Sequence, residues 1–308
     1  MRLNENTAVS TAKTLLVPYD PRHVPTYHAW MEDPAIQAAT ASEPLTLAEE
    51  FENQASWRAS HDKLTFIVCQ PLYGTESGSV TTTAAAATTT TTTPEAPAPA
   101  PPAPAPAKPI TPGTPDSPSH MIGDVNLFLY PYEEDPDDDE ADDEAESPAG
   151  ELAIPTACTG EIDIMIASPS HRGQGAGRGA VQAFLQYILR NVEGIMREYV
   201  EDKGAEGEGG AEGAAEGQAE GQAEGEGLGE VRVVTPPRLK MLMAKIGQGN
   251  EKSLALFKGL GFVQEGEVNY FGEVKLVLRD WEGKVEGVEG YEEVGYLRGE
   301  DGEEQQHE

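Results

Sequence analysis

The clearest pattern of hydrophobic positions lies between residues 161 and 199. Side chains alternate in EIDIMIA, which predicts a strand with Ile162, Ile164 and Ile166 on one face and Glu161, Asp163 and Met165 on the other. Beyond a glycine-rich turn, apolar residues recur at the i, i+3, i+4, i+7 spacing for about five helical turns. They are Val181, Phe184, Leu185, Ile188, Leu189, Val192, Ile195, Met196 and Tyr199. The segment predicts a strand followed by a long amphipathic helix.

Shorter elements are predicted on both sides of this segment. Helices are expected at 23–32, 46–60 and 250–261, and strands at 14–19, 64–70, 121–130, 239–246, 262–270 and 273–281. In the helix 46–60 we expect an apolar face made of Leu47, Phe51, Ala55 and Trp57. The strands 64–70 and 121–130 are expected to pair as an antiparallel hairpin. Strands interleaved with helices in this order predict an α/β fold, a mixed sheet with helices on both faces.

Low-complexity composition interrupts the predicted domain. Residues 71–119 are mostly Thr, Ala and Pro, 131–156 are acidic, 201–236 repeat Ala, Glu and Gly, and 282–308 are again rich in Glu and Gly. These segments have too few large apolar side chains to offset the entropy lost on ordering. We expect one domain over 1–281 with three disordered insertions, followed by an acidic disordered tail.

The same segments explain the net charge of −33. Residues 133–146, 201–230 and 282–308 hold 31 acidic side chains against three basic ones and so supply 28 of the net negative charges. These charges repel nucleic acid and anionic membranes, so neither is expected as a partner. Solubilising low-complexity sequence is the favoured interpretation, and attraction to a basic surface is the alternative.

The cysteine content and the N-terminal sequence suggest a reducing compartment. Cys69 and Cys158 lie in or beside apolar strands, so we expect buried thiols rather than a disulfide. MRLNENTAV has no apolar signal region, and no 18-residue apolar run occurs in the chain. A soluble protein of the cytoplasm, or of the nucleus, is expected. Its oligomeric state does not follow from the sequence.

The glycine-rich turn predicts a phosphate site. Glycines at 173, 175, 177 and 179 leave backbone amides uncovered where the long helix begins. No Lys-Ser or Lys-Thr pair follows, which excludes a nucleoside-triphosphatase loop. GAGRGA (175–180) matches a dinucleotide-binding motif, but the acidic strand end expected about 20 residues on would fall inside the helix. A purely structural turn is a further alternative.

Two spaced motifs carry a family resemblance. The loop from Arg172 to Gly177 closely resembles the (R/Q)xxGx(G/A) acyl-coenzyme A loop of GCN5-related N-acetyltransferases, and NEKSLALFKGLGF (250–262) resembles a second signature of that superfamily. Residues 40–51, 121–128, 160–177 and 244–253 look like the N-acetyltransferase 9 family, whose members are assigned to acetylation of the N-terminal residues of α- and β-tubulin. The resemblance implies the acetyltransferase fold, with a mostly antiparallel sheet.

The resemblance also implies a cosubstrate and its contacts. Acetyl-coenzyme A is expected, with its pyrophosphate held by Arg172, Gly173, Gln174, Gly175, Ala176 and Gly177. A backbone amide of Met165 or Ile166 would polarise the acetyl carbonyl. Asn250 and Ser253 would contact the coenzyme, and Asn250 also suits a helix N-cap. No metal is expected.

The proton path is the less defined part of the resemblance. A carboxylate must take the proton of the incoming amine, and we favour Glu161 over its neighbour Asp163. Many relatives have a tyrosine that protonates the leaving thiolate, but Phe257 stands there in this chain. Tyr270 or a water could serve instead, or the thiolate could leave unprotonated.

These features predict an acetyl-coenzyme A-dependent protein N-acetyltransferase that acts on N-terminal α-amines, with tubulin as the substrate implied by resemblance. A microtubule-binding protein that keeps the acetyltransferase fold without catalysis is one alternative. An acetyltransferase of small-molecule amines is another.

Overall fold

The alternating segments of the chain become the strands of one mixed sheet. The computed structural model describes residues 1–72, 108–133, 155–206, 235–285 and 287–298. Within these ranges the strands are β1 (Thr7–Ser10), β2 (Leu15–Pro18), β3 (Lys63–Cys69), β4 (Met121–Pro131), β5 (Ala157–Ile166), β6 (Arg238–Gly247), β7 (Val263–Gln264), β8 (Glu273–Arg279) and β9 (Glu292–Gly295). Their order in the sheet is β7-β8-β6-β5-β4-β3-β2-β1-β9.

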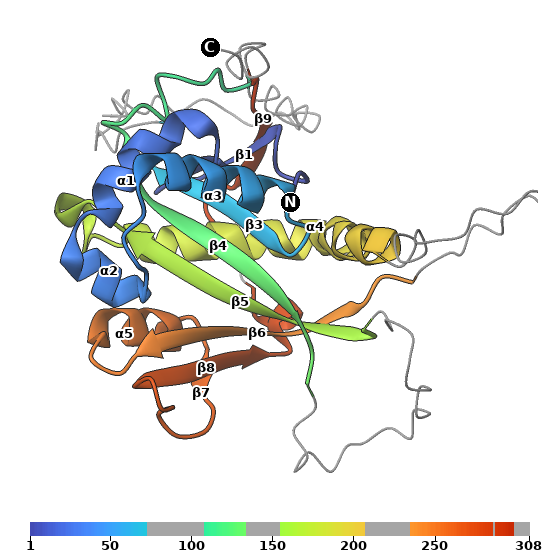
Figure 1. The fold of residues 1–308 in the computed structure, drawn as a ribbon. Coiled ribbons are helices and arrows are strands. Elements are labelled where there is room, and N and C mark those ends of the chain that lie inside the picture. Colours follow the sequence, from blue (N-terminus) through green and yellow to red (C-terminus); the bar gives the residue numbers. More distant parts are fainter. Residues whose placement is uncertain (73–107, 134–154, 207–234, 286, 299–308) are drawn as a thin grey trace, which may run out of the picture.

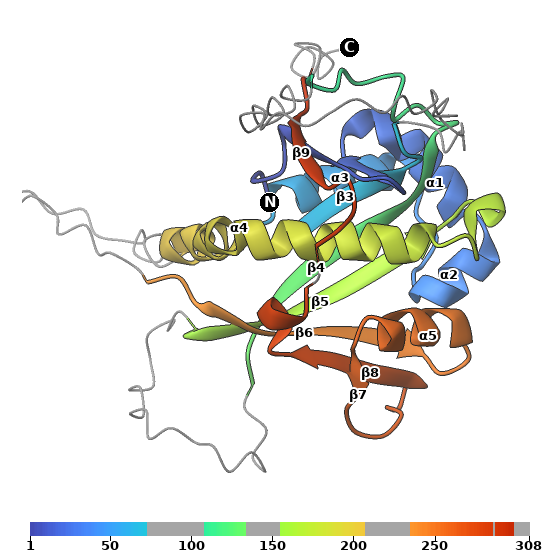
Figure 2. The same cartoon turned by 180° about the vertical axis from the view of Figure 1, so that it is seen from behind.

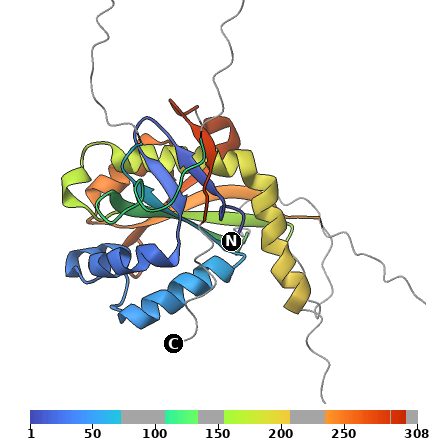
Figure 3. The same ribbon diagram turned by 90° about the horizontal axis from the view of Figure 1, so that it is seen from above.

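Helices cover both faces of this sheet. They are α1 (Val24–Met31), α2 (Pro34–Thr40), α3 (Leu47–Ala59), α4 (Ala176–Glu206) and α5 (Glu251–Gly259), with short 3-10 turns at Pro21–His23, Pro169–His171 and Trp281–Lys284. The first three helices lie in front of the sheet in Figure 1, and α4 crosses its back in Figure 2. Figure 3, seen from above, shows α1 and α3 on one side and the first half of α4 on the other. The predicted α/β class is confirmed.

The main core lies between the sheet and α4. Every residue of the predicted apolar stripe of this helix is buried or packs against that core, so the predicted periodicity is confirmed. Phe257 and Phe262 bring α5 into the same cluster. A second cluster on the opposite face joins Val24 of α1 to β2 and β3. No helix within the described ranges is long and apolar enough to cross a bilayer.

The predicted apolar face of α3 is wrong. Leu47 and Phe51 are exposed, whereas Glu50 and Gln54 are buried. The side-chain amide of Gln54 donates to the carbonyl oxygen of Tyr19 at 2.8 Å, which fixes the polar side of α3 against the domain. The helix therefore docks through hydrogen bonds as well as through apolar contact.

Strand pairing positions the site. β3 and β4 pair antiparallel, as predicted, and β4 pairs antiparallel with β5. In the described part of the sheet, β5 and β6 form the parallel pair, and their pairing runs only from Ala157–Arg238 to Glu161–Met243. β5 continues to Ile166 and β6 to Gly247, so the two strands diverge beyond this point (Figure 1). The sheet is therefore split between β5 and β6, with β7 and β8 beyond β6.

Parts of the predicted disordered segments are ordered in the structure. Residues 108–119 of the first predicted insertion form a bridge between Ile110 and Tyr296 and bury Asp116. Residues 282–298 of the predicted tail contain β9, which pairs with β1. The prediction of disorder is wrong there because a few apolar side chains, such as Val294, bury themselves within polar sequence. The structure also describes 71–72, 131–133, 155–156, 201–206 and 235–236 of the predicted insertions, and residues 201–206 form the end of α4. The remaining parts of the predicted insertions and tail, 73–107, 134–154, 207–234, 286 and 299–308, lie outside the described residues.

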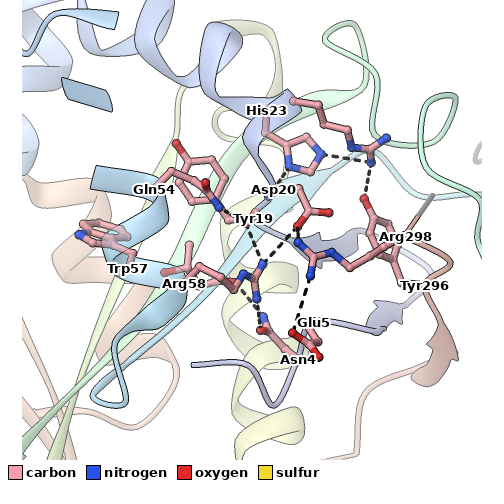
Figure 4. A network of polar contacts seen from close by, with 12 residues as sticks. Asn4, Glu5, Tyr19, Asp20, His23, Gln54, Trp57, Arg58, Tyr296 and Arg298 are labelled. Carbon is pink, nitrogen blue, oxygen red and sulfur yellow. Dashed lines mark hydrogen bonds and ion pairs between the residues drawn. The ribbon is translucent and has the colours of Figure 1, made fainter. Parts of the chain in front are cut away.

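A polar cluster holds these distant segments together (Figure 4). Asp20 is buried between Arg58 of α3, at 3.6 Å, and Arg298, at 2.8 Å. Arg58 also donates to Asn4 Oδ1 at 2.9 Å, and Arg298 lies 3.7 Å from Glu5. Burial raises the pKa of Asp20, and the flanking arginines oppose that rise. The cluster therefore fixes α3 and the segment after β9 to the start of the chain.

Gly123→Ala is expected to destabilise the sheet beside the split. A Cβ at this position of β4 would lie 1.9 Å from the carbonyl oxygen of Met165, so β4 and β5 would have to separate. We expect the free energy of unfolding to fall by about 3 kcal/mol, the upper end for overpacking. Urea denaturation measures this. Gly247→Ala on β6, where a Cβ meets nothing within 4 Å, is the control. Equal denaturation midpoints for the two variants would contradict the close approach.

Candidate active site

The split between β5 and β6 contains a pocket of about 250 Å³, here called the central pocket. It is walled by the diverging strands, by β4 and by α5, and it reaches the end of α2. Its lining includes Tyr27, Trp57, Asp124, Asn126, Phe128, Glu161, Asp163, Met165, Lys245, Asn250, Ser253, Phe257 and Glu273. Since the strands are unpaired here, the split exposes backbone groups of β5 that a regular sheet would engage.

The glycine loop lies at the open end of the split. Gly173 and Gly175 have φ of +73° and +86°, a left-handed backbone that favours glycine. Gly177 closely approaches α5 and β5, since its Cβ would lie 3.2 Å from Leu256 Cδ1 and 3.5 Å from Ile166 Cγ1. The loop thus joins the start of α4 to both walls of the split.

The amides of this loop are available to an anion. Within the described residues, no hydrogen bond uses the N–H of Gly173, Gln174, Gly175, Ala176 or Gly177 as its donor. These groups lie just before and at the first two residues of the 31-residue helix α4, whose N-terminus carries a partial positive charge. The arrangement is suited to a phosphate or pyrophosphate.

The Arg172 side chain makes hydrogen bonds within the protein, at the end of β5. Its Nε donates to the carbonyl oxygen of Ile166 at 2.6 Å, and its Nη2 donates to that of Ala167 at 2.9 Å. The side chain therefore ties the loop to the end of β5. Gln174 likewise donates to the carbonyl oxygen of Ser170. Contact of these two side chains with a coenzyme stays a prediction.

The structure brings the other predicted coenzyme residues to the same place. Met165, Asn250 and Ser253 line the central pocket, and Ile166 ends the diverging strand. Asn250 is the N-cap of α5, as predicted, and its Oδ1 accepts from the N–H of Ser253 at 3.2 Å. This capping bond fixes the Asn250 side chain at the start of α5, and Asn250 there forms part of the pocket wall.

The two predicted carboxylates differ in their surroundings. Glu161 is buried and receives a hydrogen bond from Lys245 Nζ at 2.9 Å. Asp163, also in the lining, has no ion-pair partner among the described residues. The Asp163 side chain is exposed, but the surrounding protein partly desolvates its carboxyl, and this desolvation and the charge of Glu161 raise its pKa to about 6, against the opposing effect of Lys245. Glu161 as the base stays a prediction, and the geometry favours Asp163.

Sequence reasoning missed two polar residues of the pocket wall. Asp124 and Asn126 of β4 are 2% and 5% exposed, and Asn126 Nδ2 donates to Asp124 Oδ2 at 2.7 Å. In the register of β4 and β5, Asn126 lies opposite Asp163. The signal that could have identified them is the alternation of polar residues within an otherwise apolar strand.

The predicted proton donor is not brought to the pocket. Tyr270 is 98% exposed in the β7–β8 loop and is not part of the lining. Phe257 is buried in the wall and packs edge-on against Phe262, at 5.1 Å between ring centroids. Tyr27 of α1 lines the pocket, and burial raises the pKa of its hydroxyl well above the ordinary value. The pocket therefore contains the protonated hydroxyl of Tyr27, a residue that the sequence analysis did not identify.

Asp124→Asn is expected to raise the melting temperature at pH 8. Burial raises the pKa of Asp124 to about 7 from an ordinary 3.8. The folded state therefore binds this proton more tightly, and the stabilisation present at low pH is lost as the pH rises through about 7. Asparagine keeps an acceptor for Asn126 and buries no charge. Thermal unfolding at pH 8 and pH 5 tests this, with a smaller gain expected at pH 5. A variant that melts below the wild type at pH 8 would contradict it.

Searches for similar proteins give consistent results. No family model matches the chain. The chain is 32% identical over 287 residues to alpha/beta-tubulin-N-acetyltransferase 9 of Drosophila melanogaster, covering 91% of this chain and 92% of that protein. It is 32% identical over 279 residues to the human protein of the same name, covering 90% and 86%. An N-acetyltransferase 9-like protein of Schizosaccharomyces pombe is 31% identical over 282 residues, covering 90% and 98%.

Solved structures are more distant. Spermidine N-acetyltransferase from Vibrio cholerae, in complex with CoA and spermine, has a TM-score of 0.45 and 12% identity, covering 88% of this chain and 98% of that one. The family of this chain is therefore shown by the three proteins above, which are 31% or 32% identical to it over about nine-tenths of its length.

Proposed function

The chain belongs to the N-acetyltransferase 9 family and is an N-acetyltransferase, and we propose that it transfers acetyl from acetyl-coenzyme A to N-terminal α-amines of α- and β-tubulin. The observation that carries this proposal is the split between β5 and β6, with unbonded amides at its open end and carboxylates in its wall. Tubulin as the substrate is taken from the names of the relatives. Action in the cytoplasm is part of the proposal.

The residues of the split fit acetyl-coenzyme A. The unbonded amides from Gly173 to Gly177 and the start of α4 would hold its pyrophosphate, and unpaired backbone of β5 would face its acyl arm. Asn250 and Ser253 would contact it from α5. When bound, it supplies an activated thioester.

The chain's own groups then account for the transfer. Asp163 takes a proton from the ammonium of the acceptor, which leaves a nitrogen lone pair free to attack the thioester carbonyl carbon. A backbone N–H at Met165 or Ile166 stabilises the oxyanion that forms. The carbon–nitrogen bond forms and the carbon–sulfur bond breaks. The nitrogen gives up its second proton to water, the thiolate leaves as the anion or takes a proton from water, and the amide is released.

One observation favours a second candidate function. Four of the lining residues are carboxylates and one is a lysine, an environment that also suits a polyamine. The small-molecule alternative is therefore retained. A non-catalytic role is less well supported, because a carboxyl with a pKa of about 6 beside a split sheet is suited to proton transfer.

Acetyl transfer to purified tubulin tests the proposal. Labelled acetyl-coenzyme A is incubated with the full chain and tubulin, and tryptic peptides are analysed by mass spectrometry. The label is expected on the N-terminal peptides of both subunits. Spermidine at equal concentration is the competing acceptor. Label confined to lysine side chains, or a higher kcat/KM for spermidine, would contradict the proposal.

A further inference from the structure

Lys245 is the basic side chain in the lining of the central pocket, among the residues that the structure describes. Its side chain is 41% exposed, so a molecule in the pocket can reach its ammonium. Its Nζ donates to Glu161 Oε2 at 2.9 Å and lies 5.7 Å from the centroid of the Tyr130 ring. An ammonium has several N–H donors, and the hydrogen bond to Glu161 uses one of them. The other N–H groups can therefore donate to a ligand.

The carboxylate of Glu161 holds this ammonium in place. Glu161 is buried, and it projects from the same face of β5 as Asp163. Desolvation lowers the pKa of Lys245, but the hydrogen bond and the charge of Glu161 outweigh this effect and raise the pKa above its ordinary value. Lys245 is therefore a charged donor. Glu161, which takes no proton in the transfer described above, is its positioning residue.

The spacing between Asp163 and Lys245 fits the first residue of a polypeptide. Asp163 is exposed in the pocket, two residues from Glu161 and thus about 6.5 Å along β5 from the carboxylate that holds Lys245. The amine nitrogen and the carbonyl oxygen of an N-terminal residue are about 3 Å apart. With a hydrogen bond of about 2.9 Å at each end, such a residue spans about 6–8 Å. Its amine can therefore reach Asp163 while its carbonyl oxygen accepts from Lys245.

Other amines do not offer an acceptor at this distance. The carbonyl of a lysine residue is separated from its own ammonium by the whole side chain, and a polyamine has no carbonyl. The second ammonium of a polyamine would also meet the positive charge of Lys245, which repels it. A donor at this position therefore favours an α-amine over the other amines.

We propose that Lys245, positioned by Glu161, binds the carbonyl oxygen of the first residue of the acceptor and thereby selects N-terminal α-amines over lysine side chains and polyamines. This inference rests on the proposed function and assigns a residue that determines its specificity. Asp163 takes the proton, whereas Lys245 decides which amine is presented to Asp163.

Acceptor kinetics of Lys245→Met test this role. One peptide has a free α-amine and no lysine, and a second has the same sequence with a formylated N-terminus and one added lysine. Both are assayed with acetyl-coenzyme A and the full chain at pH 8, where Asp163 is ionised. We expect kcat/KM for the α-amine peptide to fall at least about tenfold, as the loss of a charged hydrogen bond predicts. For the lysine peptide the change should be less than about threefold.

Three further variants control for charge and folding. Lys275 pairs with Glu265 at 2.7 Å, is 39% exposed and is not in the pocket lining, so Lys275→Met should keep the wild-type kinetics. Lys245→Arg keeps a charged donor and should restore most of the activity toward the α-amine peptide. Lys245→Met combined with Glu161→Gln leaves no carboxylate without its partner and should show the same selective loss. Calorimetry should give unchanged affinity for acetyl-coenzyme A in every variant.

The opposite results would overturn the inference. If Lys245→Met keeps at least about a third of the wild-type kcat/KM for the α-amine peptide, Lys245 does not bind the acceptor, and the proposed function is unaffected. An equal fall for both peptides also overturns the inference, since that result describes a role in catalysis or folding. Acetylation of the lysine peptide alone by the wild type overturns the proposed function and this inference together.

Discussion

Gly175→Glu is expected to weaken acetyl-coenzyme A binding by at least about 100-fold. Gly175 has φ of +86°, which costs a residue with a Cβ about 1–2 kcal/mol. A glutamate there would also place a carboxylate beside the amides proposed to hold the pyrophosphate. Repulsion and the loss of charged hydrogen bonds, about 1.5–3 kcal/mol each, account for the size of the effect. Isothermal titration calorimetry measures it directly.

Gly266→Glu is the matched control for this variant. Gly266 also has a positive φ, +73°, and a Cβ there meets nothing within 4 Å, as at Gly175. The two variants therefore share backbone strain and added charge, but Gly266 lies beyond β7 and away from the glycine loop. Coenzyme affinity near that of the wild type is expected. A similar loss in both variants would indicate that strain or net charge, and not a pyrophosphate site, explains the effect.

Asp163→Asn is expected to lower kcat by about 100-fold or more, the contribution typical of a general base. The carboxylate acts only when ionised, and its pKa is raised to about 6. In the wild type kcat/KM should therefore fall as the pH drops through about 6. In Asp163→Asn this acidic limb should be absent. Steady-state kinetics between pH 5 and pH 8 supply both readouts.

Glu161→Gln distinguishes the two carboxylates of β5. If Asp163 is the base, Glu161→Gln should keep an acidic limb and lose less activity, although Lys245 is then left without its partner. Loss of the acidic limb in Glu161→Gln, with the limb retained in Asp163→Asn, would assign the base to Glu161, as the sequence suggested. The pH profile is decisive because a purely structural defect would lower activity at every pH.

Long periodic elements and local motifs could be predicted from the sequence. The stripe of α4 repeats over many turns, and the positive φ of Gly173 and Gly175 is a local backbone requirement, so neither depends on distant contacts. The capping role of Asn250 is local in the same way. These features gave the backbone of the glycine loop and the cap of α5 correctly, and the role of the loop as a phosphate site stays a prediction.

The carboxylate-lined part of the pocket depends on contacts between residues far apart in the chain, and no local sequence pattern predicts such contacts. Asp163 and Asn126 meet only because β4 and β5 pair in one register, and Lys245 reaches Glu161 across the split. The buried side of α3 was mistaken because Gln54 is held by a carbonyl 35 residues earlier in the chain. Strands of four residues, such as β9, are too short for a periodic signal.

The position of β9 has a consequence for how the protein is made. β9 is the edge strand beyond β1, and it joins Thr7 to Gly295 in register. On the ribosome, β1 therefore keeps an open edge until almost every other element has emerged, and Asp20 waits equally long for Arg298. An open strand edge is a template for pairing with other chains. The nascent protein is thus exposed to misassembly along β1 until β9, the last strand of the described residues, has emerged and paired with it.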